Sequence, residues 1–152
     1  MPINQSRYVL IEFDFQENPD IATNLLIRVR DVGAKPVVAH VERYEFIQDN
    51  PQLLADWKEA GIYAQVNKGS FLGGFGSKAQ KTAFQLLDHR LITVIASDAH
   101  GVASRTPHML ETYESLSERV TRQYLDVLFK ENPQRICNNQ PVLVHKTVSF
   151  RR

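Results

Sequence analysis

The sequence is poor in cysteine, in long apolar runs and in net charge, and each shortage excludes a class of protein. Its single cysteine, Cys137, permits no internal disulfide, which is typical of proteins kept in a reducing cytoplasm. No apolar run approaches the ~20 residues of a membrane helix, and residues 1–7 lack the apolar core of a signal peptide. The formal net charge of +1 provides no basic surplus for binding nucleic acid. We therefore predict a cytoplasmic protein that neither inserts into membranes nor binds nucleic acid.

Cys137 is also a poor candidate for a catalytic nucleophile. Cysteine-dependent phosphatases carry an arginine at the position six residues after the cysteine, where this sequence has Leu143. A free cysteine otherwise behaves as a small apolar residue. We interpret Cys137 as a packing residue.

What the sequence does contain is a regular alternation of strand-like and helix-like segments. Four apolar runs rich in β-branched and aromatic residues begin about every 28 residues, at 8–13, 35–39, 63–67 and 91–97. Helical patterns lie between and after them, at 21–32, 49–61, 77–88, from 107 onward and at 124–129. This alternation indicates an α/β fold with a parallel sheet. The length of 152 residues suits a single domain, spanning 1–152.

Several residues predict where these elements end. Ser77 is a suitable cap for the helix at 77–88, and the last helix should close before Pro133. The tail beyond it has room for a short strand at 141–145. The glycine-rich stretch 69–76 lacks the Gly-Lys-Ser/Thr of a Walker loop, and its G-x-G-x-x-A match begins seven residues after the third strand. We interpret this stretch as a loop with tight backbone turns.

Residues with metal-binding chemistry follow three of the four predicted strands. Glu12 ends the first, His40 follows the second, and Asp98 and His100 follow the fourth. The carboxyl ends of parallel strands lie along one edge of a sheet, where α/β proteins build their active sites. Asp98 and His100 are two residues apart, so a straight strand would point both to one face. Carboxylate and imidazole together favour zinc, manganese or iron over calcium, and the pattern predicts a site for such ions.

Two arginines stand close to these residues in the sequence. Arg43 follows His40 by three residues, and Arg105 follows His100 by five. Guanidinium groups grip phosphate oxygens with a bidentate fork. Metal ions lower the pKa of bound water from ~16 to ~7 and screen the charge that develops on a phosphoryl group. The predicted chemistry is therefore the metal-dependent hydrolysis of a phosphate ester.

Each of these residues also has an ordinary structural interpretation. His40 alone is more often a hydrogen-bonded polar residue than a ligand, and Asp98 after a serine is a common turn former. Glu12 is harder to explain in this way, because it interrupts an apolar strand. A buried, unpaired carboxylate there would cost several kcal/mol, so Glu12 needs a partner or a metal ion.

Four other polar residues are assigned lesser roles. We expect His89 to interact with the C-terminus of its helix and Glu42 to form an ion pair nearby rather than to bind metal. His145 fits a structural or surface position. His108 lies near the predicted site and is a weaker candidate for contact with the substrate.

Taken together, these motifs resemble a known family of bacterial enzymes. The motifs are residues 8–13 (YVLIEF), 39–44 (AHVERY), 67–73 (NKGSFLG) and 96–100 (ASDAH) with Arg105. In this order they are similar to the PHP-type (polymerase and histidinol phosphatase) protein tyrosine phosphatases of bacterial capsule and exopolysaccharide gene clusters. The resemblance extends from about Tyr8 to Pro141.

The resemblance implies a fold, a cofactor and a partner. The family fold is a distorted (β/α)7 barrel, of about seven strand–helix units, and this chain would form a partial barrel without the first strands. The family holds a cluster of divalent metal ions, often Mn2+, with Zn2+ or Fe2+ as alternatives. The implied substrate is phosphotyrosine on a tyrosine kinase that controls capsular or exopolysaccharide synthesis.

The resemblance also implies a role for each site residue. Glu12 would bridge two metal ions, Asp98 would bind one of that pair, and His40 and His100 would hold a third. The guanidinium groups that would bind and polarise the phosphate belong to Arg43 and Arg105.

The sequence departs from the family pattern in three places. Val41 stands where the family has proline, which makes the loop of His40 less rigid. Asp14 stands where the family commonly has proline, which adds a charge near the predicted metal site. The family's first strand, with His-x-His and acidic residues, does not precede Tyr8. Each metal position would then lack at least one ligand, and the first strand would present an open edge. We therefore expect self-association through this edge or a remodelled N-terminus.

Three functions stay open at this point. The first is a metal-dependent protein tyrosine phosphatase. The second is a non-catalytic, truncated remnant that binds the kinase or itself, and its metal content would be well below one ion per chain. The third is a PHP phosphoesterase for a small phosphate such as histidinol phosphate or a nucleotide, which would need a deeper pocket.

Overall fold

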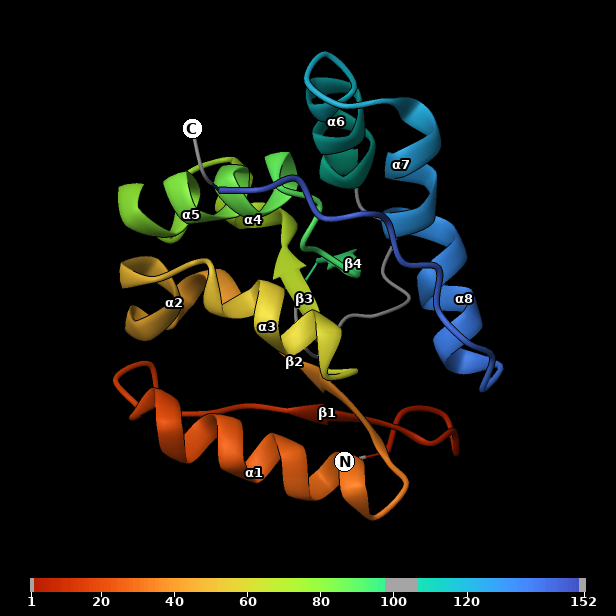
Figure 1. Ribbon diagram of the computed structural model, residues 1–152. Coiled ribbons are helices and arrows are strands. Elements are labelled where there is room, and N and C mark those ends of the chain that lie inside the picture. The colour runs from red at the N-terminus through yellow and green to blue at the C-terminus, as the bar shows by residue number, and fades with distance from the viewer. Residues whose placement is uncertain (1, 98–106, 151–152) are drawn as a thin grey trace.

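The protein is built around a sheet of four parallel strands, seen in a computed structural model that describes residues 2–97 and 107–150 (Figure 1). The strands lie in the order β1-β2-β3-β4, and their bounds are Tyr8–Ile11, Lys35–Val38, Tyr63–Asn67 and Val94–Ala96. All three pairings are parallel. Within the described residues the sheet is open, with β1 and β4 at its edges. The α/β fold with a parallel sheet is thus confirmed.

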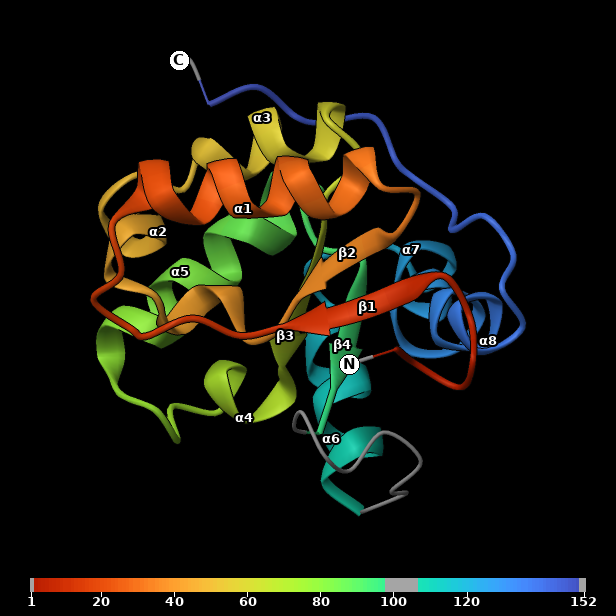
Figure 2. The same ribbon diagram turned by 90° about the horizontal axis from the view of Figure 1, so that it is seen from below.

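Helices connect and cover the strands. Their bounds are α1 Pro19–Asp31, α2 Glu45–Asp49, α3 Leu53–Glu59, α4 Lys68–Phe71, α5 Ser77–Asp88, α6 Pro107–Leu116, α7 Arg122–Asp126 and α8 Asn132–Cys137. A 3-10 turn, Val41–Arg43, follows β2, and a π-helical turn, Val127–Glu131, joins α7 to α8. In both views, α2 and α5 lie on one side of the strands and α7 and α8 on the other (Figures 1 and 2).

The strands are short apolar runs because both faces of the sheet are covered. Neighbouring residues Val37 and Val38 are both buried, yet they pack in different apolar clusters. Successive side chains of a strand point to opposite faces, which explains this division. The larger cluster contains Val38, Trp57 and Leu86, and the smaller one contains Tyr8 and Val37.

Helix α1 begins two residues before the predicted start, because Asn18 caps it. The Asn18 side-chain oxygen accepts hydrogen bonds from the backbone N–H groups of Asp20 and Ile21, at 2.8 and 3.1 Å. Pro19 occupies the first turn, where a missing N–H costs nothing. The left-handed Gly33, with φ of 97°, follows the end of the helix.

Three predicted helices have wrong boundaries. Ser77 does not cap α5, because it is the first helical residue and Gly76, with φ of 98°, precedes it without a side-chain cap. The chain also does not leave the helical conformation before Pro133, since the π-helical turn leads directly into α8. Pro133 lies in the first turn of α8, where its missing N–H is tolerated. In place of the helix predicted at 49–61, the structure has the shorter helix α3, with α2 before it.

The C-terminal segment contains no strand at 141–145, contrary to the prediction. Its backbone instead pairs with the side chain of Asn132, whose amide contacts both the N–H and the carbonyl of Leu143, at 2.8 and 3.0 Å. The ring of His145 packs edge-on against Tyr124 at 4.7 Å, which fits its predicted structural role. His89 caps the C-terminus of α5, where its backbone N–H donates to the carbonyl of Gln85 at 3.0 Å, and its ring stacks on Phe150 at 3.8 Å. This segment is therefore held against the fold by side-chain contacts and by a backbone hydrogen bond from the N–H of Val148 to the carbonyl of His89.

The outer edge of β1 is partly occupied by the residues before it. Pro2 forms an isolated antiparallel bridge with Val9, and the N–H of Ile3 donates to the carbonyl of Tyr8 at 2.9 Å. Self-association through this edge stays a prediction. None of the helices in the described part of the chain combines the length and apolar composition that a membrane span requires.

Candidate functional site

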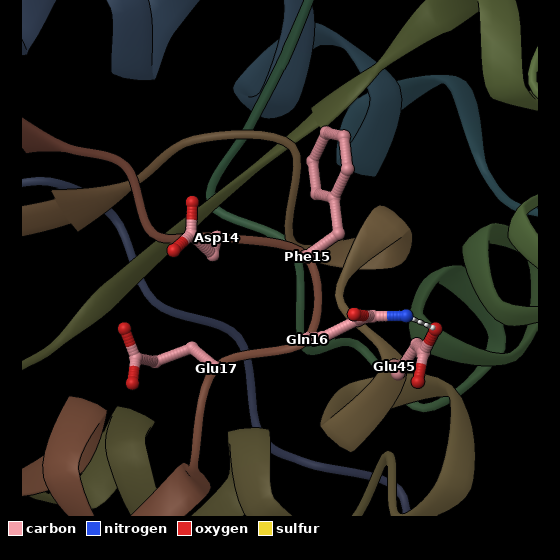
Figure 3. Close-up of a pocket in the computed structure, with 5 residues that line it drawn as sticks. All are labelled: Asp14, Phe15, Gln16, Glu17 and Glu45. Atoms are coloured by element: carbon pink, nitrogen blue, oxygen red, sulfur yellow. Dashed lines mark hydrogen bonds between the residues drawn. The ribbon is translucent and has the colours of Figure 1, made fainter.

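The loop after β1 borders an open hollow of about 690 Å³ (Figure 3). Its lining residues are Asp14, Phe15, Gln16, Glu17 and Glu45. The amide of Gln16 donates to a carboxylate oxygen of Glu45 at 3.2 Å, which joins the loop to α2. Three of the five lining side chains are carboxylates, which repel an anion, so this hollow is not where a phosphate would bind.

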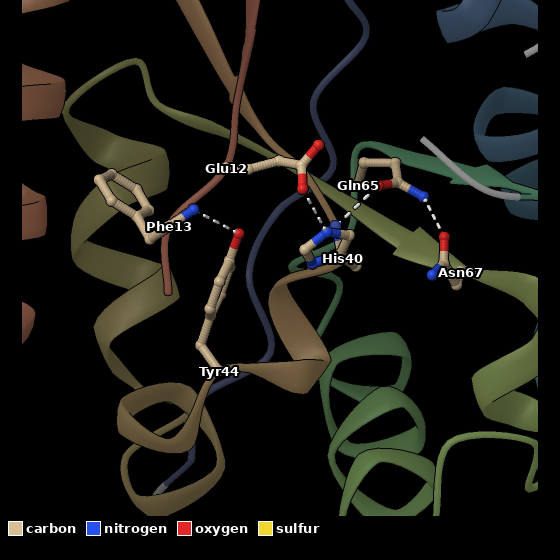
Figure 4. Close-up of polar contacts among 6 residues, drawn as sticks. All are labelled: Glu12, Phe13, His40, Tyr44, Gln65 and Asn67. Carbon is tan, nitrogen blue, oxygen red and sulfur yellow. Dashed lines mark hydrogen bonds and ion pairs between the residues drawn. The ribbon is translucent and has the colours of Figure 1, made fainter. Parts of the chain in front are cut away.

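The ends of β1 and β2 bring Glu12 and His40 together. Ile11 and Val38 are paired in the parallel register, so the residues that follow them leave the same edge of the sheet. A carboxylate oxygen of Glu12 lies 3.2 Å from Nε2 of His40 (Figure 4). The predicted meeting of these two side chains is therefore present. Asp98, His100 and Arg105 lie outside the described residues, as does the side chain of His108.

Glu12 is not buried, contrary to the argument that singled it out. It follows the last residue of β1, and 52% of its side chain is exposed. Because β1 ends at Ile11, Glu12 belongs to the loop and does not interrupt the strand. His40 is the buried partner, with 8% of its side chain exposed, and its Nδ1 has no hydrogen-bond partner among the described residues.

The backbone of His40 adopts an uncommon conformation. Its φ and ψ of 38° and 54° are left-handed, which costs a non-glycine residue on the order of 1 kcal/mol or more. The side chain of Gln65, on β3, holds the backbone there by accepting a hydrogen bond from the His40 N–H at 2.7 Å. Gln65 also donates to the side-chain oxygen of Asn67 at 2.9 Å. The imidazole is thus fixed through its backbone by the neighbouring strand.

Glu42 anchors the turn after His40 from inside the protein. It is fully buried, and its carboxylate accepts hydrogen bonds from the N–H of Asn67, at 3.1 Å, and from the hydroxyl of Ser70. Burial raises the pKa of this carboxyl from 4.5 to about 7. The expected ion pair of Glu42 is not found among the described residues, because the side chain enters the core and binds the β3–α4 junction instead.

Arg43 ends the same turn and lies over two aromatic rings. Its guanidinium carbon is 4.5 Å from the ring centre of Phe15 and 4.1 Å from that of Phe75. Among the described residues, no carboxylate lies within ion-pair distance of Arg43. Its N–H groups are therefore suited to bind an anion next to His40.

Glu12 and His40 are close enough to bind one metal ion or two neighbouring ions. Zinc-type ligands bind at about 2.0–2.2 Å, which places two ligand atoms of one ion about 3 Å apart, and the observed separation of oxygen and nitrogen is 3.2 Å. Within residues 2–97 and 107–150, no group of three or more His, Cys, Asp or Glu side chains is arranged to hold an ion. The described residues therefore supply two ligands, and the further ligands proposed from the sequence, Asp98 and His100, lie outside them.

Two positioning roles escaped the sequence analysis, that of Gln65, which it did not single out, and that of Glu42, for which it expected an ion pair. Gln65 is a polar residue in an otherwise apolar strand, and Glu42 lies within the His-x-Glu-Arg motif. Both facts are visible in the sequence. The hydrogen bond of Gln65 with His40 and that of Glu42 with the β3–α4 junction depend on strand register, which no local sequence pattern shows.

Comparisons with known proteins agree with this fold and site. The family model described as capsular polysaccharide synthesis, CpsB/CapC, matches residues 1–138. The tyrosine-protein phosphatase YwqE of Bacillus subtilis is 34% identical over 142 residues, covering 93% of this chain and 56% of YwqE. CpsB of Streptococcus pneumoniae is 32% identical over 143 residues, covering 91% and 59%. The chain thus spans little more than half the length of these curated relatives.

The fold also matches a solved structure. A crystal structure from the pair YwqE of Bacillus subtilis and CpsB of Streptococcus pneumoniae, described as metal-dependent tyrosine phosphatases, superposes with a TM-score of 0.85 at 32% identity. The match covers 100% of this chain and 61% of the other. The open parallel sheet is therefore part of the PHP-type barrel, as predicted. On the evidence of sequence and fold, the chain belongs to the CpsB/CapC family of capsular polysaccharide synthesis proteins.

Proposed function

We propose that this chain provides a metal-dependent phosphotyrosine phosphatase site that acts on a tyrosine kinase controlling capsular or exopolysaccharide synthesis. The observation that carries the proposal is the contact of Glu12 with His40 at 3.2 Å, with Arg43 in the same turn as His40. Two relatives are named tyrosine-protein phosphatases, and the matching family is described by capsular polysaccharide synthesis, which supports this substrate. We place the reaction in the cytoplasm.

The proposed ligands are Glu12, His40, Asp98 and His100, and the proposed ions are Mn2+, with Zn2+ or Fe2+ as alternatives. When bound, such ions supply a water of lowered pKa and compensate the charge on the phosphoryl oxygens. Glu12 provides an oxygen ligand and His40 a nitrogen ligand, which suits these metals.

The arginines bind and orient the phosphate in this proposal. Arg43 stands three residues after His40 within one 3-10 turn, so the phosphate-binding group and the metal ligand are held by the same backbone. Glu42 holds that turn by accepting a hydrogen bond from the N–H of Asn67. Gln65 holds the start of the turn by accepting a hydrogen bond from the N–H of His40. Such rigidity matters because the donors must lie where negative charge develops in the transition state. Arg105 is the second proposed phosphate ligand.

The test is the hydrolysis of an aryl phosphate by the chain with added Mn2+. We expect turnover that a chelator abolishes and that His40→Ala removes. The matched control is His145→Ala, since His145 also packs against a tyrosine ring but lies outside the site. Turnover that persists in His40→Ala, or is equally lost in His145→Ala, would contradict the proposal.

A second candidate function is binding without catalysis. One observation favours it: within residues 2–97 and 107–150, no group of three or more potential ligands is arranged to hold an ion. Elemental analysis of the purified protein separates the two functions. A catalytic chain should hold at least one ion, whereas a non-catalytic one should hold well under one ion per chain.

A further inference from the structure

Two exposed phenyl rings flank the arginine of the proposed phosphate site. Phe15 and Phe75 are 40% and 42% exposed, although phenylalanine is usually buried. The rings come from different loops, one after β1 and one after α4. Both lie under the guanidinium of Arg43, at 4.5 and 4.1 Å from its central carbon. Their shared neighbour indicates a common role.

The glycine-rich stretch 69–76 is what carries Phe75 to Arg43. Gly73 and Gly76 have φ of 86° and 98°, which turn the chain back on itself. The N–H of Gly74 donates to the carbonyl of Gly69 at 2.9 Å, closing this turn. A Cβ on Gly69 would lie 3.2 Å from Cε2 of Phe75, so the ring is seated directly on the α4 backbone. The stretch therefore positions an aromatic ring.

Phe15 connects Arg43 to the proposed metal ligand. Its ring lies edge-on to His40 at 5.5 Å and tilted against Tyr44 at 5.8 Å. The N–H of Glu45 donates to the Phe15 carbonyl at 2.8 Å, which fixes the loop that carries the ring. A ligand bound by Arg43 and a metal at His40 would therefore have Phe15 beside it.

We propose that Phe15 and Phe75 form an aryl-binding rim that holds the aromatic ring of an aryl phosphate while Arg43 holds its phosphate. A guanidinium lying over rings keeps its N–H groups in its own plane, where they can fork around phosphate oxygens. The exposed parts of the rings then offer apolar contact to a substrate ring one bond beyond the phosphate. This inference rests on the proposed function and adds residues that select aryl over alkyl phosphates.

The test compares two ligands that share a phosphate and differ in the ring. Isothermal titration with phenyl phosphate and methyl phosphate, in the presence of a chelator so that neither ligand is hydrolysed, is made on the unaltered chain and on Phe15→Leu, Phe75→Leu and Gly69→Ala. We expect each variant to bind phenyl phosphate about two- to tenfold more weakly and to bind methyl phosphate within about twofold of the unaltered chain. Gly69→Ala keeps both rings and pushes the ring of Phe75 away from α4.

The matched control is Phe84→Leu. The Phe84 ring also lies under an arginine, Arg119, at 4.7 Å, but outside the site. Phe84→Leu should bind phenyl phosphate and methyl phosphate with the same affinities as the unaltered chain. Equal weakening of both ligands in Phe15→Leu and Phe75→Leu would overturn the proposal, because the rings would then only support Arg43. A lack of any preference for phenyl phosphate in the unaltered chain would overturn it too.

The two proposals fail in different ways. If the chain prefers phenyl phosphate through both rings yet never hydrolyses it, the phosphatase function is wrong and the aryl-binding rim stands. If the chain hydrolyses aryl phosphates and the ratio of the two affinities is the same in Phe15→Leu, Phe75→Leu and the unaltered chain, only the rim is wrong.

Discussion

In the described part of the chain, two arginines lie over phenylalanine rings, and they differ in one respect. Arg119 lies over Phe84 at 4.7 Å and donates two hydrogen bonds of 2.8 Å to the carboxylate of Asp88. Arg43 lies over two rings, and no carboxylate among the described residues pairs with it. Ring contacts position both guanidinium groups. The carboxylate of Asp88 makes Arg119 a structural group, whereas Arg43, without such a partner among the described residues, is suited to bind an anion.

The position of the nearest carboxylate explains the difference. Asp88 lies at the exposed end of α5, where its carboxylate reaches Arg119. Glu42 directly precedes Arg43, but it is fully buried and its carboxylate is hydrogen-bonded to Asn67 and Ser70. Burial thus keeps an acidic neighbour from occupying the proposed phosphate site.

The largest effect should come from replacing each arginine by lysine, which keeps the charge and removes the fork. Arg43→Lys should lower the turnover of an aryl phosphate by about 100-fold or more, because the lost donors stabilise the transition state. Arg119→Lys should leave turnover within about twofold. Steady-state kinetics with Mn2+ measures both. Similar losses in the two variants would remove the distinction between these arginines.

Removal of the two carboxylates should affect stability very differently. Glu42→Ala leaves the buried N–H of Asn67 and the hydroxyl of Ser70 without a partner, so the free energy of unfolding should fall by about 3 kcal/mol. Asp88→Ala breaks only an exposed ion pair and should cost less than about 1 kcal/mol. Urea denaturation measures both values. A cost for Asp88→Ala as large as that for Glu42→Ala would contradict the assigned burial.

The titration of Glu42 should change the free energy of unfolding somewhat less than Glu42→Ala does. Its pKa is raised from 4.5 to about 7 in the folded protein, so folding favours the neutral carboxyl. The stabilisation is fully present below pH 4.5 and is lost as the pH rises through about 7. Between pH 5 and 8, the unaltered chain should lose about 2 kcal/mol relative to Glu42→Gln, which does not titrate. Denaturation in the presence of a chelator checks this, and parallel pH curves would refute it.

The sequence predicted the part of the site that follows from strand order. Once parallel strands are assigned, Glu12 and His40 must leave the same edge, and their contact of 3.2 Å agrees. The burial of Glu42 could not be predicted, because it depends on packing against β3 and α4. The path of residues 69–76, which brings Phe75 to Arg43, likewise depends on contacts between loops.

Local boundaries were predicted less well for a related reason. Ser77 and Pro133 both suit a helix start, and the surrounding chain decides where that start falls. Gly76 takes the cap position before α5, and the π-helical turn lets the chain continue through Pro133. The predicted roles of Asp98, His100 and Arg105 stay predictions, because these residues lie outside the described part of the chain.

The most direct test of the account is a calorimetric titration of the chain with Mn2+. We predict that the unaltered chain binds the ion, and that Glu12→Gln and His40→Ala each weaken binding at least about tenfold. His145→Ala, which alters a histidine packed on Tyr124 away from the site, should bind as the unaltered chain does. An unaltered chain that binds no Mn2+, or equal affinities in all four proteins, would contradict the claim that Glu12 and His40 are metal ligands.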